Sequence, residues 1–159
     1  MHYCPAPASF FTPQRPWGGP NVIATGYFDG ETEGLLQCGI CSQAYFFALI
    51  DWDEQQDRRI FSLARLPAPA FTEAVELLVR AYGPQREPYW VPDNPSLTDS
   101  ARRERWDAVH AIVRPREAVE AVLLTEHIDR DVLSLFVVDA PQFDGSRDWW
   151  AILAPRPER

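Results

Sequence analysis

Two cysteines separated by two residues are the side chains whose type and spacing point most directly to chemistry. Cys38 and Cys41 enclose Gly39 and Ile40 in a Cys-x-x-Cys pair. A short turn of this kind lets both sulfurs point at one cation, while nearby backbone N–H groups stabilise the negative charge of the thiolates. Structural zinc sites bind four ligands, most of them Cys thiolates and His nitrogens. The pair therefore predicts half of a zinc site.

The other ligands of such a site have to come from a distant part of the chain. The turn resembles the knuckle half of a zinc ribbon, but a ribbon has a second Cys-x-x-Cys pair, and this chain has a single further cysteine. That cysteine is Cys4, which lies two positions after His2. We therefore expect zinc to be bound by Cys38 and Cys41, with Cys4 as the third ligand and His2 as the fourth.

Two other interpretations of the cysteine pair stay open. A thioredoxin-like redox site places its first cysteine at the N-terminus of a helix, where the helix dipole lowers the pKa of the thiol. Here the segment 42–50 would have to form that helix. Alternatively, Cys38 and Cys41 are small hydrophobic residues at a turn between two strands.

Two acidic segments also contain residue types that could do chemistry. Residues 126–129 (Glu-His-Ile-Asp), followed by Asp131, place a histidine among carboxylates, which suits a general base or a metal ligand. No nucleophile or oxyanion partner is identifiable for His127, so we interpret this segment as the polar tip of a hairpin. Residues 51–54 (Asp-Trp-Asp-Glu) lack the glycine and the final Glu of a calcium loop, and we expect a solvated turn there.

The elements that position these residues are predicted from the spacing of apolar side chains. Over residues 21–66, strand-like apolar runs, the Asp29-Gly30 turn signal and a polar turn over 51–57 predict a meander of about four antiparallel strands. Apolar residues at helical spacing predict a helix over 71–82, with Thr72 as its N-cap and a Gly-Pro pair after its end.

The second half of the chain is expected to add another helix and three strands. The helix covers about 99–113, with Thr98 as its N-cap. The strands cover residues 118–128, 132–138 and 149–153. On the last strand Trp149 and Trp150 would point to opposite faces, so one of them needs a helix, an arm or a partner to cover it.

This order of elements, strands followed by helices and then strands, predicts an α+β fold. A chain of 159 residues has the length of one domain, so we expect a single domain over 1–159. Its core, residues 21–159, is expected to be a mainly antiparallel sheet with two helices packed on one face. Residues 1–20, rich in proline and aromatic residues, are expected to form an extended arm.

Composition and charge limit the classes of partner. The net charge is −8, and all 15 basic residues are arginines. The arginines are interleaved with acids, and pairs such as Arg58-Arg59 are interpreted as solvated surface, so we expect no binding to nucleic acid. The chain shows no apolar run of roughly 18 residues and no signal peptide, which predicts a protein that does not insert into membranes. Three cysteines and the arginine-rich, lysine-free composition suggest a cytoplasmic protein of bacterial origin.

No catalytic constellation is recognisable in the sequence, which favours binding over catalysis. We therefore expect a small non-enzymatic accessory protein that binds another protein and is stabilised by the zinc site. Two alternatives stay open. One is a thiol-dependent redox enzyme that uses Cys38 and Cys41. The other is an acidic inhibitor or immunity-type protein that covers a basic partner.

Overall fold

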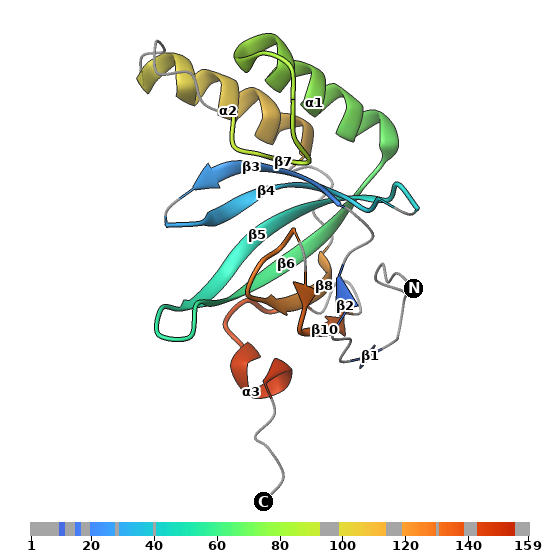
Figure 1. The fold of residues 1–159 in the computed structure, drawn as a ribbon, viewed down its shortest axis with the longest axis vertical. Coiled ribbons are helices and arrows are strands. Elements are labelled where there is room, and N and C mark those ends of the chain that lie inside the picture. Colours follow the sequence, from blue (N-terminus) through green and yellow to red (C-terminus); the bar gives the residue numbers. More distant parts are fainter. Residues whose placement is uncertain are drawn as a thin grey trace, which may run out of the picture.

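One mainly antiparallel sheet and three helices make up the residues that the structure describes, which are 10–11, 15–16, 20–27, 29–39, 41–92, 99–113, 119–129, 131–138 and 143–154. The structure is a computed structural model, drawn as a ribbon in Figure 1. Its strands are β1 (Phe10–Phe11), β2 (Arg15–Pro16), β3 (Asn21–Tyr27), β4 (Glu31–Gln37), β5 (Ala44–Asp53), β6 (Arg58–Leu66), β7 (Tyr89–Trp90), β8 (Val119–Thr125), β9 (Asp131–Val132) and β10 (Ser134–Val137). Its helices are α1 (Ala68–Tyr82), α2 (Asp99–Val113) and α3 (Trp149–Leu153).

Eight strands form one sheet in the order β1-β10-β8-β6-β5-β4-β3-β7, and β2 pairs separately with β9. Every pairing in the large sheet is antiparallel except that of β3 with β7. The predicted α+β class with a mainly antiparallel sheet is therefore confirmed. The meander predicted over residues 21–66 is also confirmed, because β3, β4, β5 and β6 pair in sequence.

Apolar residues lie on both faces of the meander. Leu35 and Phe46 belong to one cluster of buried residues, whereas Leu36 and Phe47 belong to another. Successive residues of a strand point to opposite faces, so continuous apolar runs in β4 and β5 mean that both faces of the sheet are covered.

Helices α1 and α2 lie side by side on one face of the sheet (Figure 1). Their buried residues share a cluster with the strands, which contains Ile23, Leu35, Phe46, Phe71, Ala74, Leu78, Val109 and Val113. The helices also contact each other through Tyr82 and Trp106, whose stacked rings have centroids 5.9 Å apart. Among the described helices, none has the length and apolar character needed to cross a bilayer.

The other face of the sheet curls into a trough. Val22 on β3 and Leu135 on β10 come from near the two ends of the strand order, yet they belong to the same buried cluster. Phe47 and Phe61 from the middle of the sheet complete that cluster and meet edge to face, with ring centroids 5.4 Å apart. All of these residues are buried, yet the residues of α1 and α2 belong to the other cluster, so we infer that the sheet curls over this face. The turns between strands then form the two ends of the trough.

The two long helices differ in how well their starts were predicted. Helix α1 begins at Ala68, so the prediction that Thr72 caps its start is wrong. Pro67 occupies the N-cap position without a side-chain hydrogen bond, and a further proline follows in the first turn, where its missing N–H costs nothing. Helix α2 has the predicted bounds, Asp99–Val113, whereas Thr98 lies outside the described residues.

The strand predicted over 149–153 is wrong, because these residues form α3. The side chain of Asp148 accepts a hydrogen bond from the backbone N–H of Ala151 at 3.2 Å and so caps the helix. Trp149 is buried and packs near Phe136 and Phe143, with ring centroids 5.8 and 6.2 Å away. Trp150 is partly buried against the same cluster as Trp149, and its indole N–H donates to the carboxylate of Asp51 at 2.7 Å.

Two other predicted segments differ from the structure in extent. The strand predicted over 118–128 ends at Thr125, and the one predicted over 132–138 is divided between β9 and β10. The extended arm predicted over 1–20 lies mostly outside the described residues. Its described parts, β1 and β2, pair with β10 and β9.

Candidate functional site

Three turns meet at one end of the trough: the β3–β4 turn, the β5–β6 turn (residues 54–57) and the turn after β8 (residues 126–129). Strand β6 brings them together, because its second residue, Arg59, lies opposite Trp52 on β5 and Thr125 on β8. Between the turns lies a recess of about 330 Å³, which we call the acidic pocket. The carboxylates that line it belong to Asp29, Glu31, Asp57, Glu126 and Asp129.

Arg59 lines the acidic pocket from inside the trough. The residue is only 3% exposed, and its guanidinium donates hydrogen bonds to the backbone carbonyl oxygens of Asp29 at 2.5 Å and Glu31 at 3.3 Å. The guanidinium also lies over the ring of Trp52, 4.2 Å from its centroid. Two of its nitrogens donate hydrogen bonds and its plane lies over an indole ring, which offsets part of the cost of burying this charge. The interpretation of Arg58-Arg59 as solvated surface is therefore wrong for Arg59.

The β3–β4 turn is shaped to receive this guanidinium. Gly30 has a φ of +133°, and a Cβ at this position would lie 2.5 Å from a terminal nitrogen of Arg59. A glycine is therefore required by both the backbone and the space. Asp29 and Asp57 have φ values of 48° and 51°, a conformation that Asp tolerates better than most residues.

Tyr89 orients one carboxylate of the acidic pocket. Its hydroxyl donates a hydrogen bond to Oε2 of Glu31 at 2.8 Å, and Glu31 itself is buried. Burial of the tyrosine, followed by the nearby Glu31 carboxylate, raises the pKa of Tyr89 above its ordinary value. Tyr89 therefore remains a hydrogen-bond donor at neutral pH and holds Glu31 in one position.

Among the described residues that line this pocket, the carboxylates outnumber the arginine side chains by five to one. Arg59 is bound to backbone carbonyls. Nε of Arg58 lies 3.8 Å from Oε1 of Glu126, and this contact between two partly exposed side chains is of small energetic value. The carboxylates are spread around the recess, and the described residues contain no group of three or more His, Cys, Asp or Glu side chains that could hold a metal ion. A guanidinium group donates several hydrogen bonds in one plane, so it could contact more than one of these carboxylates.

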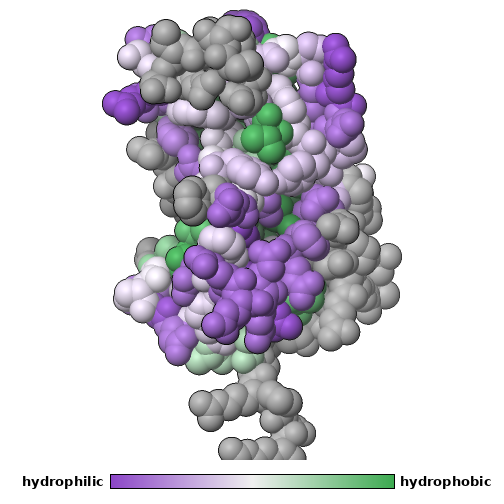
Figure 2. All heavy atoms as spheres, turned by 60° about the vertical axis from the view of Figure 1, so that its left-hand side comes forward, coloured by the Kyte–Doolittle hydropathy of each residue, from purple (hydrophilic) through white to green (hydrophobic). Residues whose placement is uncertain are grey.

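The surface around these turns is hydrophilic. Figure 2 brings forward the side of the molecule that lies on the left in Figure 1, where the β3–β4 and β5–β6 turns are. Hydrophilic residues gather over the part of this face below the two long helices (Figure 2). The segment 126–129, which we interpreted as a hairpin tip, thus forms a turn that contributes Glu126, His127 and Asp129 to the pocket.

The cysteine pair lies at the opposite end of the sheet, in the β4–β5 turn. This turn is closed by hydrogen bonds from the backbone N–H of Cys38 to the carbonyl of Gln43 at 2.9 Å and from Ser42 to Cys38 at 3.0 Å. Cys38 is 1% exposed, whereas Cys41 is exposed. The location at a strand turn agrees with the sequence, and Cys38 fits the interpretation as a small buried hydrophobic residue.

The four-ligand zinc site stays a prediction. Its proposed third and fourth ligands, Cys4 and His2, lie outside the described residues. Cys38 and Cys41 are described, but no group of three or more His, Cys, Asp or Glu side chains that could hold a metal ion is found among the described residues.

The redox interpretation loses the helix on which it depends. Residues 44–50 belong to strand β5, so the segment 42–50 is not a helix. A strand has little net dipole, and the redox chemistry of a Cys-x-x-Cys pair depends on the dipole at a helix N-terminus.

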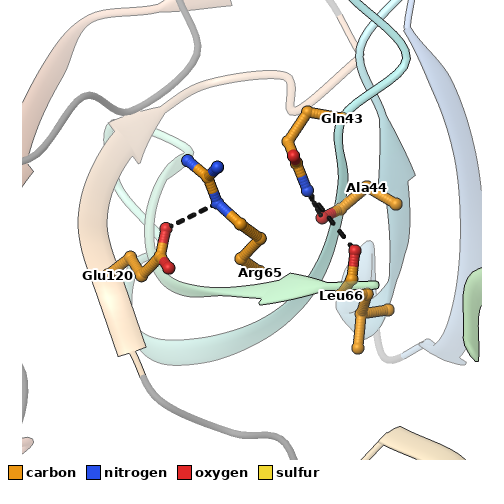
Figure 3. Close-up of polar contacts among 5 residues, drawn as sticks. All are labelled: Gln43, Ala44, Arg65, Leu66 and Glu120. Carbon is orange, nitrogen blue, oxygen red and sulfur yellow. Dashed lines mark hydrogen bonds and ion pairs between the residues drawn. The ribbon is translucent and has the colours of Figure 1, made fainter. Parts of the chain in front are cut away.

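A second recess, of about 570 Å³, lies beside the cysteine turn. Its charged groups pair with each other, because Nε of Arg65 lies 2.9 Å from Oε2 of Glu120. Figure 3 shows these two side chains pointing toward one another, and the amide of Gln43 directed at the carbonyl oxygens of Ala44 and Leu66. This recess therefore presents less unbalanced charge than the acidic pocket.

Sequence reasoning did not identify Arg59 or Tyr89 as parts of a site. Tyr89 stands in a Pro-rich connection with no periodic signal of its own. For Arg59 a signal was available, because it alternates with Phe61 and Leu63, both of which point into the trough. A charged residue in phase with buried neighbours on a strand indicates an inward-facing side chain.

Comparison with known proteins adds no functional assignment, because the chain matches no protein-family model, no curated protein and no solved structure.

Proposed function

We propose that this protein is a non-enzymatic binding protein that recognises a basic segment of a partner protein. The observation that carries the proposal is the acidic pocket, in which five carboxylates from three turns and the first residue of β4 surround one recess. The buried cation in that recess, Arg59, is bound to backbone carbonyls instead of to those carboxylates. Among the described lining residues, the carboxylates therefore outnumber the cationic groups.

An arginine or lysine side chain from a partner supplies the missing charge. A guanidinium binds carboxylates through paired hydrogen bonds, and a pocket with several carboxylates offers it more than one such pair. Glu31 is already held by Tyr89, so little side-chain freedom is lost there when the cation binds.

The whole chain supports the same kind of partner. Its net charge of −8 attracts basic proteins over a distance and accelerates their association. The proposal thus combines the accessory protein expected from the sequence with the alternative of an acidic inhibitor or immunity-type protein. A cytoplasmic location and zinc binding remain separate proposals, which this pocket does not require.

A pair of matched double variants tests the proposal. The probe is a fluorescein-labelled hexapeptide of alternating Arg and Ala, and its binding to the full chain is followed by fluorescence anisotropy at low salt. Asp57→Asn with Glu126→Gln removes two charges from the pocket. Glu73→Gln with Glu76→Gln removes two charges from exposed positions on α1. We expect the pocket pair to weaken binding by about tenfold or more and the α1 pair by about twofold or less.

Both variants change the net charge equally, so they separate the pocket from the overall field. Equal losses for the two pairs would show that the peptide responds only to net charge, and the proposal would be wrong. A peptide that fails to bind the unaltered chain at low salt contradicts it directly.

A further inference from the structure

Another recess, of about 370 Å³, opens where strand β7 ends beside β3. Strand β7 pairs with β3 only at Val22 and Ile23, and among the described residues nothing pairs with β3 beyond Ile23 on that side. Pro92, which follows shortly after β7, has no N–H to continue the pairing. Among the described residues, the end of β3 is therefore unpaired on this side, and its residues 24–27 line the recess.

Aromatic side chains form much of this recess, which we call the aromatic pocket. Tyr82 and Trp106 line it as a stacked pair, with ring centroids 5.9 Å apart. Tyr27 and Val91 are the two exposed large hydrophobic residues of the described chain, 58% and 37% exposed, and both line this pocket. Figure 2 shows a small hydrophobic area above the hydrophilic part of this face. Exposed apolar residues that gather at one recess indicate a binding surface.

A buried hydroxyl in the same pocket lacks a hydrogen-bond partner. Thr25 is 5% exposed and lines the aromatic pocket, and its Oγ1 atom has no partner among the described residues. Buried polar side chains are almost always hydrogen-bonded, so an orphaned hydroxyl at a recess points to a ligand or a water there.

The aromatic pocket adjoins the acidic pocket. Tyr27, at the end of β3, lines both recesses. One extended segment lying along the open edge of β3 can therefore reach the two pockets at once. Extended segments commonly bind at exposed strand edges, with alternate side chains entering pockets.

We infer that the aromatic pocket is a second subsite for the same basic partner, and that it receives a large apolar side chain close in sequence to the Arg or Lys held in the acidic pocket. This inference rests on the proposed function. The acidic pocket selects the partner by charge. When this pocket holds the partner's basic side chain, an apolar residue next to it in the partner's sequence lies close to Tyr27 and the aromatic pocket. A polar group of the bound segment satisfies the hydroxyl of Thr25.

The test uses a positional-scanning set of acetylated hexapeptides that contain one Arg, with each other position varied in turn. Binding is measured against the full chain and against two single variants, Val91→Ser and Thr25→Val. We expect Phe, Trp or Leu within two residues of the Arg to strengthen binding by about tenfold relative to Ala. Either variant should reduce that gain by about threefold or more while the dependence on Arg persists.

The outcomes separate this inference from the proposed function. Dependence on Arg without an apolar preference overturns the inference and leaves the proposed function intact, as does an apolar preference that neither variant alters. Binding that does not depend on Arg overturns the proposed function. Because Val91 is partly exposed and Val differs from Thr25 only at the hydroxyl position, circular dichroism and a thermal melt suffice to show that both variants are folded.

Discussion

Arg59 shows how a single residue joins the core to the candidate site. Its guanidinium bonds to two carbonyls of the β3–β4 turn and stacks on Trp52 of β5. A lysine cannot make both bonds in the same plane or stack in the same way. We therefore expect Arg59→Lys to lower the free energy of unfolding by about 1–3 kcal/mol in urea denaturation.

Arg80→Lys is the matched control, since Arg80 is exposed on the last turn of α1. Its effect should stay within about 0.5 kcal/mol. Equal effects of the two substitutions would contradict the role assigned to the buried guanidinium.

Tyr89 makes the stability of the folded protein depend on pH in the alkaline range. In the unfolded chain its hydroxyl loses a proton near the ordinary tyrosine pKa of 10.0, whereas burial and Glu31 raise the pKa in the folded protein. Above pH 10 the unfolded state therefore binds fewer protons than the folded state, and stability falls as pH rises. Below that pH the full contribution is present.

We expect Tyr89→Phe to reduce this alkaline loss of stability. The difference in slope between the two proteins should be below about 1.4 kcal/mol per pH unit, the limit for one proton, because the ring is only half buried. Urea denaturation at pH 8, 10 and 11 measures it. Parallel profiles for the two proteins would show that Tyr89 is not the group responsible.

At the scale of elements, helix α3 depends on a single cap. Asp148 accepts the hydrogen bond from Ala151, and the helix has only five residues. We expect Asp148→Ala to cost about 1 kcal/mol, visible as a lower melting temperature and weaker near-ultraviolet circular dichroism from Trp149. Asp148→Asn preserves the cap and should cost much less. If Asp148→Asn and Asp148→Ala lower the stability by similar amounts, the effect comes from the charge of Asp148 and not from the cap.

The cysteine turn is the element on which the zinc prediction depends. If Cys4 and His2 complete the site, the purified protein contains about one zinc per chain, and chelation lowers its melting temperature. Cys41→Ser is the more informative variant, because Cys41 is exposed, whereas Cys38→Ser places a hydroxyl in the core irrespective of metal. Elemental analysis that finds well under one zinc per chain rejects the site.

Helices and strands with a regular spacing of apolar residues could be predicted from the sequence, whereas those that depend on contacts with distant residues could not. The meander and α2 follow from local alternation and helical spacing. The run Trp-Trp-Ala-Ile-Leu is apolar enough for a strand, and only the cap at Asp148 and packing against Phe136 favour α3. The two-residue strands β1, β7 and β9 exist through pairing with remote strands, which no local pattern reports.

The candidate site illustrates the same limit. The segments that form the acidic pocket were each recognisable as acidic turns or charged strand ends. That three turns meet at one end follows from the pairing of β8 with β6, between residues about sixty positions apart in the chain. The contribution of Tyr89 follows from the parallel pairing of β7 with β3. Neither pairing can be deduced from the spacing of apolar residues.

At the scale of the whole molecule, the curled sheet separates two different ends. One end contains the cysteine turn and the Arg65–Glu120 pair, and the other contains the acidic pocket. Because the charge at the acidic end is only partly balanced, ligand binding there should weaken as salt screens the field. Such a salt dependence by itself would not locate the site.

The most direct measurement is therefore a ¹⁵N NMR titration of the full chain with ethylguanidinium, the isolated head group of arginine, at constant ionic strength. Acetamide serves as the neutral control. The proposed function predicts saturable shifts confined to the three turns of the acidic pocket, at residues 29–31, 57–59 and 126–129, and no comparable shifts with acetamide. Shifts of equal size around the acidic residues of α1, or none at the three turns, would contradict the account.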